Sequence, residues 1–200
     1  MLSRSAYPAP RQQLPVREIV KKKPDVTLFS GDKMLGGPQS GIILSSNEII
    51  NLIKSNSIYR TVRCDKITIA LLDDIIRSFE KNGFLKTNLS LELLTQSRKD
   101  LMITANYIID KIPSKLIDEL GIKIIESMVE AGSGSLPEKN IRSIALKFKP
   151  SKYSVNHVSD HFRRSPKPII GYIKKESYFI DLKAVLPHQK DNIVGAIKSI

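Results

Sequence analysis

Two short apolar runs with a glycine-containing loop between them constrain the fold of this chain most. The runs, residues 25–29 and 40–44, have the length and composition of β-strands. The loop between them holds Lys33 and the pair Gly36–Gly37, which is followed by a proline, a pattern typical of a tight turn. The pattern predicts two strands joined by a loop that carries one lysine.

Helical periodicity follows this segment. Ser46 is expected to cap a helix that runs to about Lys54, with Ser45 and Asn47 as alternative caps, and Asp65 is expected to cap a longer helix. A second long helix is predicted from about residue 89 to 112, because apolar residues recur there at roughly helical spacing. Pro113 lies just past its expected end.

The pattern changes in the C-terminal half of the chain. The predicted strands and helices there are strands at 122–129, 144–148 and 169–180, with a hairpin turn at 174–176, and helices at 155–164 and 188–200. Helices mixed with an antiparallel sheet indicate an α+β domain. The sequence therefore predicts an α/β chain in three parts: an unstructured leader (1–15), a partial α/β unit (16–85), and a connecting helix with an α+β domain (86–200).

Composition excludes several classes of protein. A hydrophobic fraction of 41% and a charged fraction of 26% are those of a soluble globular protein. No run approaches the roughly 18 apolar residues of a membrane span, and the N-terminus lacks the apolar core of a signal peptide. The single cysteine, Cys64, has no partner for an internal disulfide, which favours a reducing cytoplasm.

The charge is strongly basic and uneven. The chain carries 32 Lys and Arg against 20 Asp and Glu, a net charge of +12, and residues 139–175 hold one acid, Asp160, among their many cations. Such an excess favours polyanionic partners, although a solvated basic face explains it equally well. His157 and His161 are four residues apart on a predicted helix, but no third ligand accompanies them, so no metal site is expected.

A lysine such as Lys33 serves as a Schiff-base carrier if its site lowers its pKa and presents it to an aldehyde, but one lysine in a glycine-containing loop is a weak signal for that role. Small residues on both sides, Gly31, Gly36 and Gly37 among them, let the backbone approach a bound group closely. The alternative is an ordinary surface lysine beside a turn. The loop is not a nucleotide-binding phosphate loop, because the spacing of that motif is absent.

The whole string DVTLFSGDKMLGGPQSGIIL (25–44) resembles the cofactor-lysine segment of the bacterial selenocysteine synthases, the L-seryl-tRNA(Sec) selenium transferases. Further segments resemble the same family in the same order. They are YRTVRCDKITIALLDDIIRSF (59–79), LLTQSRKDL (93–101), GSGSLPEKNIRSIALKF (132–148) and SPKPIIGYIKKESYFIDLKAVLP (165–187). The resemblance extends from about residue 16 to the C-terminus.

The resemblance implies a fold, a cofactor and a reaction. The implied fold is part of an aspartate-aminotransferase-like (fold type I) transferase that depends on pyridoxal 5'-phosphate (PLP): a remnant of its large domain plus its α+β C-terminal domain. Family members convert L-seryl-tRNA(Sec) to L-selenocysteinyl-tRNA(Sec) with selenophosphate, through a PLP-bound dehydroalanyl intermediate. Lys33 would hold the cofactor and transfer protons, with Ser30, Gly36 and Gly37 next to the cofactor.

Two arginines complete the implied site. Arg60 and Arg63 match a family pair that is implicated in holding the selenium donor, and guanidinium groups recognise phosphate-like oxyanions well. Their spacing of three places them on one face only in a helix or turn. Judged from the residues alone, the favoured interpretation is a pair of surface arginines on a connector.

The resemblance also implies missing parts. In the family, a tRNA-binding domain and most of the cofactor domain precede the lysine, so this chain is expected to be an incomplete C-terminal part. The expected partners are seryl-tRNA(Sec), selenophosphate and further copies of the chain, with no membrane and no DNA. The alternatives are a related PLP-dependent lyase acting on a small amino acid, and a non-catalytic tRNA-binding remnant.

Overall fold

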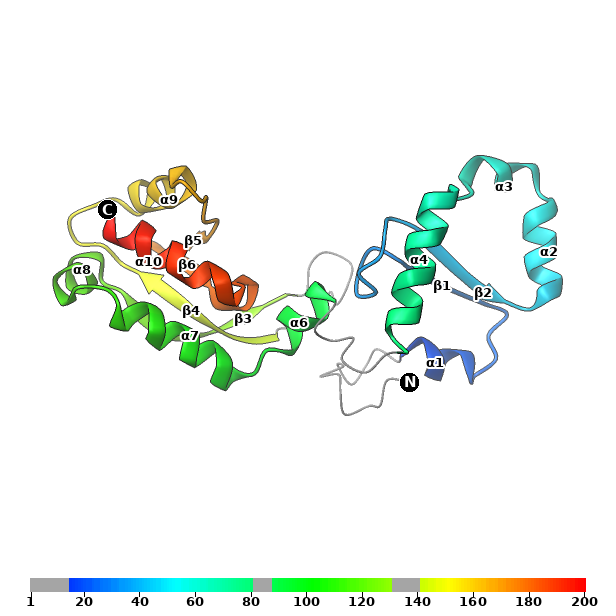
Figure 1. Cartoon of the computed structure of the whole chain (residues 1–200), viewed down its shortest axis with the longest axis horizontal. Helices are drawn as coiled ribbons and strands as arrows, with labels where there is room; N and C mark the ends of the chain where they lie inside the picture. Colours follow the sequence, from blue (N-terminus) through cyan, green and yellow to red (C-terminus); the bar gives the residue numbers. More distant parts are fainter. Residues whose placement is uncertain (1–14, 81–87, 131–140) are drawn as a thin grey trace. The chain divides into compact units, whose positions relative to one another are not determined.

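The computed structural model describes residues 15–80, 88–130 and 141–200 (Figure 1). They form a mixed α/β structure, which divides into two compact units, Met1–Thr95 and Gln96–Ile200. The predicted leader lies, apart from Pro15, outside the described residues, as does the predicted boundary between 85 and 86. In the structure the units divide about ten residues later than predicted, so 89–95 belong to the first unit.

The first unit combines one β-hairpin with short helices. Strands β1 (Val26–Ser30) and β2 (Gly41–Ser45) pair antiparallel, with Phe29 opposite Ile42. The helices are α1 (Val16–Val20), α2 (Asn47–Ser55), α3 (Ser57–Val62), α4 (Lys66–Ser78) and α6 (Leu89–Thr95). Both predicted strands are confirmed, each displaced by one residue. The short helix α3 was not predicted.

Local side-chain caps explain where α2 and α4 begin. The Ser46 hydroxyl accepts a hydrogen bond from the backbone N–H of Ile49 at 3.4 Å. The Asp65 carboxylate accepts one from the N–H of Thr68 at 2.7 Å, and this bond lowers the pKa of Asp65. Each cap satisfies a backbone donor that the first turn of a helix leaves free. Both predicted caps are confirmed.

The first unit buries little apolar surface. Among its described residues only Thr27, Gly31 and Leu91 are buried. Leu28 in the hairpin is 69% exposed and Ile67 in α4 is 74% exposed. The exposed large hydrophobic residues of this unit are Val20, Val26, Leu28, Ile43, Leu44, Leu52, Ile58, Val62, Ile67, Ile69, Leu71, Ile76 and Leu89. Because so many large apolar side chains of this unit are exposed while only three of its described residues are buried, its apolar side chains are open to contact with other polypeptide.

The second unit is an antiparallel sheet with helices, as predicted. The strand order is β3 (Lys123–Val129), β4 (Ile141–Phe148), β6 (Ser177–Asp181) and β5 (Tyr172–Lys174). The helices are α7 (Arg98–Asp110), α8 (Ser114–Leu120), α9 (Val155–Arg164) and α10 (Lys190–Lys198), with single 3-10 turns at Leu182–Ala184 and Pro187–Gln189. Helix α9 has the predicted bounds, and the hairpin turn between β5 and β6 is confirmed at Lys175–Glu176.

An aromatic cluster lies in the core of the second unit. Phe148, Phe162 and Tyr178 are each at most 1% exposed. The ring centroid of Phe162 is 5.2 Å from that of Phe148, edge to face, and 5.3 Å from that of Tyr178, stacked. These residues join β4, α9 and β6 in one core. The second unit therefore has the closed core that the first one lacks.

The prediction of one long helix at 89–112 is wrong. The chain forms two helices, α6 and α7, separated by Gln96 and Ser97. Ser97 and Asp100 form a capping box, in which each side chain accepts a hydrogen bond from the other residue's backbone N–H at 3.2 Å. This box starts a new helix, although apolar residues continue at helical spacing across the break. No helix in the described ranges is long and apolar enough to cross a membrane.

Candidate functional site

The loop that carries Lys33 is closed by its own backbone. Gly31 N–H donates to the carbonyl of Ser40 at 2.8 Å, so the two strands stay paired where the loop begins. Gly37 N–H donates to the carbonyl of Gly31 at 2.8 Å, and Gly36 N–H donates to that of Lys33 at 3.0 Å. These bonds give the lysine a defined position at the end of the hairpin.

The glycines of this loop occupy positions where a side chain does not fit. A Cβ on Gly31 would collide with the Ser40 hydroxyl, and one on Gly37 would lie 2.9 Å from the carbonyl oxygen of Gly31. Gly36 has φ +74°, a conformation that L side chains rarely adopt. The loop therefore needs glycine for its own geometry, whatever it binds.

Asn88 ties the loop to a helix far along the chain. Its side-chain Nδ2 donates to the carbonyl of Leu35 at 2.8 Å, and its Oδ1 accepts from Leu91 N–H at 3.1 Å. The second bond is an N-cap-like contact at the start of α6, and the first holds the turn after Lys33. Asparagine ahead of a helix is a recognisable capping signal, but Asn88 is not among the predicted caps or site residues. Its bond to Leu35 spans 53 residues and has no local signal.

The Lys33 amine is accessible. The side chain is 44% exposed, and its Nζ lies 3.4 Å from Oδ2 of Asp32. An ion pair at such a solvated position contributes little to stability, on the order of 1 kcal/mol at most. The amine is thus open to an electrophile and is held near one carboxylate.

A cavity of about 440 Å³ lies beside the loop. Its lining residues are Asp32, Gly36, Gly37, Ile75, Ser78, Asn88, Leu89 and Ser90. Of the predicted cofactor residues, Gly36 and Gly37 line it, whereas Lys33 and Ser30 do not. Ser30 is the last residue of β1 and is exposed.

The arginine pair lies at the end of α3. Arg60 is in the last turn of the helix, and Arg63 follows the helix in an extended conformation, with φ −67° and ψ 139°. The backbone therefore leaves the helix between them, so the two do not share one helical face. Both are exposed, and neither forms an ion pair with a described residue. Neither lines the cavity beside the lysine loop.

The residues present fit part of a PLP site. Lys33 offers an accessible amine and Asp32 a carboxylate at the cavity, whereas the Asn88 amide and the Ser78 hydroxyl are already hydrogen-bonded to the backbone. The N–H groups of Gly36 and Gly37 already donate within the loop, so a phosphate here would need other donors. No aromatic side chain lines this cavity to cover a cofactor ring. Within the described ranges, no group of three or more His, Cys, Asp or Glu side chains is placed to hold a metal ion.

Comparison with solved structures supports the fold. The chain is similar to the structure of D-glucosaminate-6-phosphate ammonia-lyase, with a TM-score of 0.56 and 15% sequence identity. The match covers 90% of this chain and 44% of that one. At this identity the likeness concerns the fold alone.

Comparison with curated proteins and family models gives the family. The chain is 31% identical to the L-seryl-tRNA(Sec) selenium transferase of Desulfotalea psychrophila, over 100% of this chain and 42% of that protein. It is 32% identical to the protein of the same name from Escherichia coli O45:K1, over 93% of this chain and 41% of that protein. The chain thus spans about two fifths of the length of these relatives. The family model described as L-seryl-tRNA selenium transferase matches residues 6–186. The chain therefore belongs to the L-seryl-tRNA selenium transferase family.

Proposed function

We propose that this chain supplies the cofactor lysine and the C-terminal part of a fold type I, PLP-dependent enzyme that converts L-seryl-tRNA(Sec) to L-selenocysteinyl-tRNA(Sec) with selenophosphate. The observation that carries the proposal is Lys33, an accessible amine on a closed glycine loop, in a chain of this family. The enzyme is expected to act in the cytoplasm.

Each proposed residue has a role that its position supports. PLP, when bound, withdraws electrons from the α-carbon of the seryl group and so allows its hydroxyl to leave. Lys33 would hold the cofactor through Nζ and, once released, would move a proton at that carbon. Gly36 and Gly37 would form part of the cavity wall next to the cofactor, and Ser30 would set the start of the loop.

The selenium donor needs cationic groups, because selenophosphate is an oxyanion. Arg60 and Arg63 are exposed and are not paired with carboxylates in the described part of the chain, so both guanidinium groups are available to it. Since the chain turns away from the helix between them, they would approach the donor from two directions rather than from one helical face.

Activity is proposed to require polypeptide that corresponds to the remaining length of the relatives, whether joined to this chain or separate. Two observations support this requirement. The cavity beside the lysine loop lacks an aromatic wall, and the first unit leaves apolar side chains such as Leu28 and Ile67 open to contact. Further copies of the chain are expected in the assembled enzyme.

The cofactor role of Lys33 is tested by covalent trapping on the full chain. The protein is incubated with PLP, reduced with borohydride and mapped by peptide mass spectrometry. Lys33 is expected to carry most of the label. Lys33→Arg, which keeps the charge, should abolish that labelled peptide, whereas the matched variant Lys54→Arg at an exposed helical lysine should not. Label spread evenly over the lysines, with no preference for Lys33, would overturn the cofactor assignment.

The reaction itself is tested separately. Formation of selenocysteinyl-tRNA from seryl-tRNA and selenophosphate is measured with this chain, alone and together with the remaining part of a relative. Only the combination is expected to be active, and Lys33→Arg in it should be inactive. If the combination instead acted on a free small amino acid and ignored the seryl-tRNA, the transferase proposal would be wrong.

A further inference from the structure

Asn88 uses the two ends of its side-chain amide for two different parts of the first unit. Its Nδ2 donates to the carbonyl of Leu35 at 2.8 Å, and its Oδ1 accepts from the N–H of Leu91 at 3.1 Å. The partners fix which end is which, because a carbonyl only accepts and a backbone N–H only donates. The orientation of the amide is therefore set by α6 on one side and by the turn after Lys33 on the other.

The α6 side of this contact is anchored. The backbone carbonyl of Asn88 accepts from Glu92 N–H at 2.9 Å, so both the backbone and the side chain of Asn88 bind the first turn of the helix. Leu91 is 1% exposed and is the one large apolar residue that is buried in the described part of the first unit. The amide donor is therefore presented to the loop from a packed position.

The other side of the contact reaches Lys33 through one planar group. The carbonyl of Leu35 and the N–H of Gly36 belong to the same peptide unit, which is rigid. Asn88 binds the oxygen of this unit, and its N–H donates to the carbonyl of Lys33 at 3.0 Å. A rotation of the plane that releases Asn88 also moves the N–H away from Lys33. Asn88 therefore holds the backbone of Lys33 through a single intermediate group.

The backbone decides where the amine of Lys33 is presented. Within the described ranges the Lys33 side chain forms one ion pair, the 3.4 Å contact with Asp32, and it is 44% exposed. An ion pair at such a solvated position restrains a long side chain only weakly. Reaction rates depend steeply on displacements of about 1 Å in a reacting group. A residue that fixes the Lys33 backbone is therefore expected to influence the reactivity of its amine.

We propose that Asn88 is a positioning residue for the cofactor lysine: through the peptide unit between Leu35 and Gly36, it sets the direction in which Lys33 Nζ is presented. The proposal rests on the cofactor role proposed for Lys33. The alternative is a cap alone, in which Asn88 starts α6 and its bond to the loop has no effect on the lysine. The two roles use different ends of the amide, Nδ2 for positioning and Oδ1 for capping, so substitutions separate them.

Two substitutions remove the donor and keep the cap. In Asn88→Asp a carboxylate accepts from Leu91 N–H, and in Asn88→Ser an uncharged hydroxyl does so. The carboxylate has no proton to donate, and the hydroxyl ends one bond short of the amide nitrogen. Each full chain is trapped with PLP and borohydride, and the label at Lys33 is measured relative to that at the exposed Lys54. This ratio should fall about two- to tenfold in both variants, the factor that corresponds to the loss of one hydrogen bond.

The pH dependence gives a readout that capping alone would not produce. Hydrogen exchange of the Gly36 amide, measured without PLP, reports the turn. A protonated carboxyl group regains one O–H donor, so in Asn88→Asp the excess exchange over the unaltered chain should shrink as the pH falls from about 6 to about 4. A cap would instead weaken as it lost its charge. Asn88→Ser should show no such recovery. Asp32, another carboxyl group at this cavity, is present in all three chains and cancels in the comparison.

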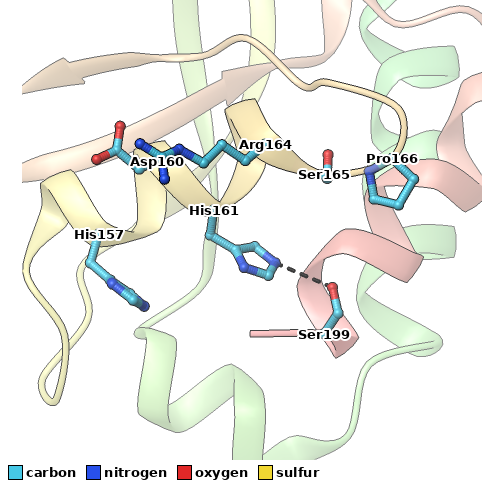
Figure 2. A pocket seen from close by; sticks show the side chains of 7 residues that line it. All are labelled: His157, Asp160, His161, Arg164, Ser165, Pro166 and Ser199. Atoms are coloured by element: carbon cyan, nitrogen blue, oxygen red, sulfur yellow. Dashed lines mark hydrogen bonds between the residues drawn. The ribbon is translucent and has the colours of Figure 1, made fainter.

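Two matched variants test for general destabilisation. Asn56→Ser changes another helix cap, since Asn56 Oδ1 accepts from Ile58 N–H at 2.9 Å at the start of α3. His161→Ala removes another side-chain bond between distant residues. Figure 2 shows the His161 ring of α9 directed at Ser199 at the end of α10, with Nε2 3.2 Å from its hydroxyl. Both variants should leave the Lys33 label unchanged. A fall as large as that in the Asn88 variants would make the effect general and would refute the positioning role.

The outcomes also separate this role from the cofactor assignment. A label that prefers Lys33 in the unaltered chain and survives both Asn88 substitutions would overturn the role of Asn88 and leave the cofactor assignment standing. An unaltered chain without preference for Lys33 would remove the cofactor assignment and, with it, the positioning role. Faster exchange of the Gly36 amide in the variants would in that case show a contact that holds the turn without serving the lysine.

Discussion

Replacing Gly36 with alanine should open the lysine loop. Gly36 has φ +74°, and a Cβ built there lies 2.7 Å from Nδ2 of Asn88. The left-handed backbone costs an alanine about 1–2 kcal/mol. The Asn88 amide would have to move, so its bond to the Leu35 carbonyl, about 0.5–1.5 kcal/mol, would also be lost or weakened. The combined cost is about 1.5–3.5 kcal/mol.

Hydrogen exchange followed by mass spectrometry measures the destabilisation of the lysine loop at the individual peptides that contain it. The amides of Gly31 and Gly37 are protected by the bonds that close the loop. A cost of this size should speed their exchange by roughly ten-fold to several hundred-fold, within the limit set by the stability of the unit. The matched change is Gly41→Ala in β2, where a Cβ meets nothing within 4 Å, and it should leave this exchange nearly unchanged.

A double-mutant cycle tests the mechanism. If the clash with Asn88 contributes, Gly36→Ala combined with Asn88→Ala should cost less than the sum of the two single changes. Equal exchange in Gly36→Ala and Gly41→Ala would refute the assigned strain. Strict additivity in the cycle would show that the backbone conformation alone, and not Asn88, accounts for the cost.

Two further predictions concern the second unit. Phe162→Ala removes a fully buried ring between Phe148 and Tyr178 and should lower the free energy of unfolding by about 3–5 kcal/mol in urea titrations followed by circular dichroism; a loss below about 1 kcal/mol would contradict the core assignment. Burial lowers the pKa of Lys183, whose Nζ donates to the carbonyl of Gln96 at 2.8 Å. The unfolded chain therefore holds this proton to higher pH than the folded one. The free energy of unfolding should therefore rise as the pH increases from the lowered pKa of Lys183 towards 10.5. The difference in this free energy between the unaltered chain and Lys183→Met should grow over that interval. A constant or shrinking difference would contradict the lowered pKa.

Local sequence signals predicted much of the secondary structure. The caps at Ser46 and Asp65 and the bounds of α9 came from residues within a few positions of each other. The break between α6 and α7 also has a local signal, the Ser97–Asp100 capping box, but the continuing apolar spacing concealed it. Short-range hydrogen bonds decide where helices begin, so these features are readable along the chain.

The sequence by itself determined the family, the two strands around Lys33, and the basic character of residues 139–175. Only the tertiary structure decided that Asn88 holds the lysine loop, that the Gly36 and Gly37 amides are already used, and that His161 joins α9 to α10. Burial also differs between the units: the first leaves many of its large apolar side chains exposed, whereas the second packs its apolar side chains into a closed core. The physical reason is distance along the chain: contacts between residues tens of positions apart depend on how whole elements pack, and local composition and spacing carry no record of that packing.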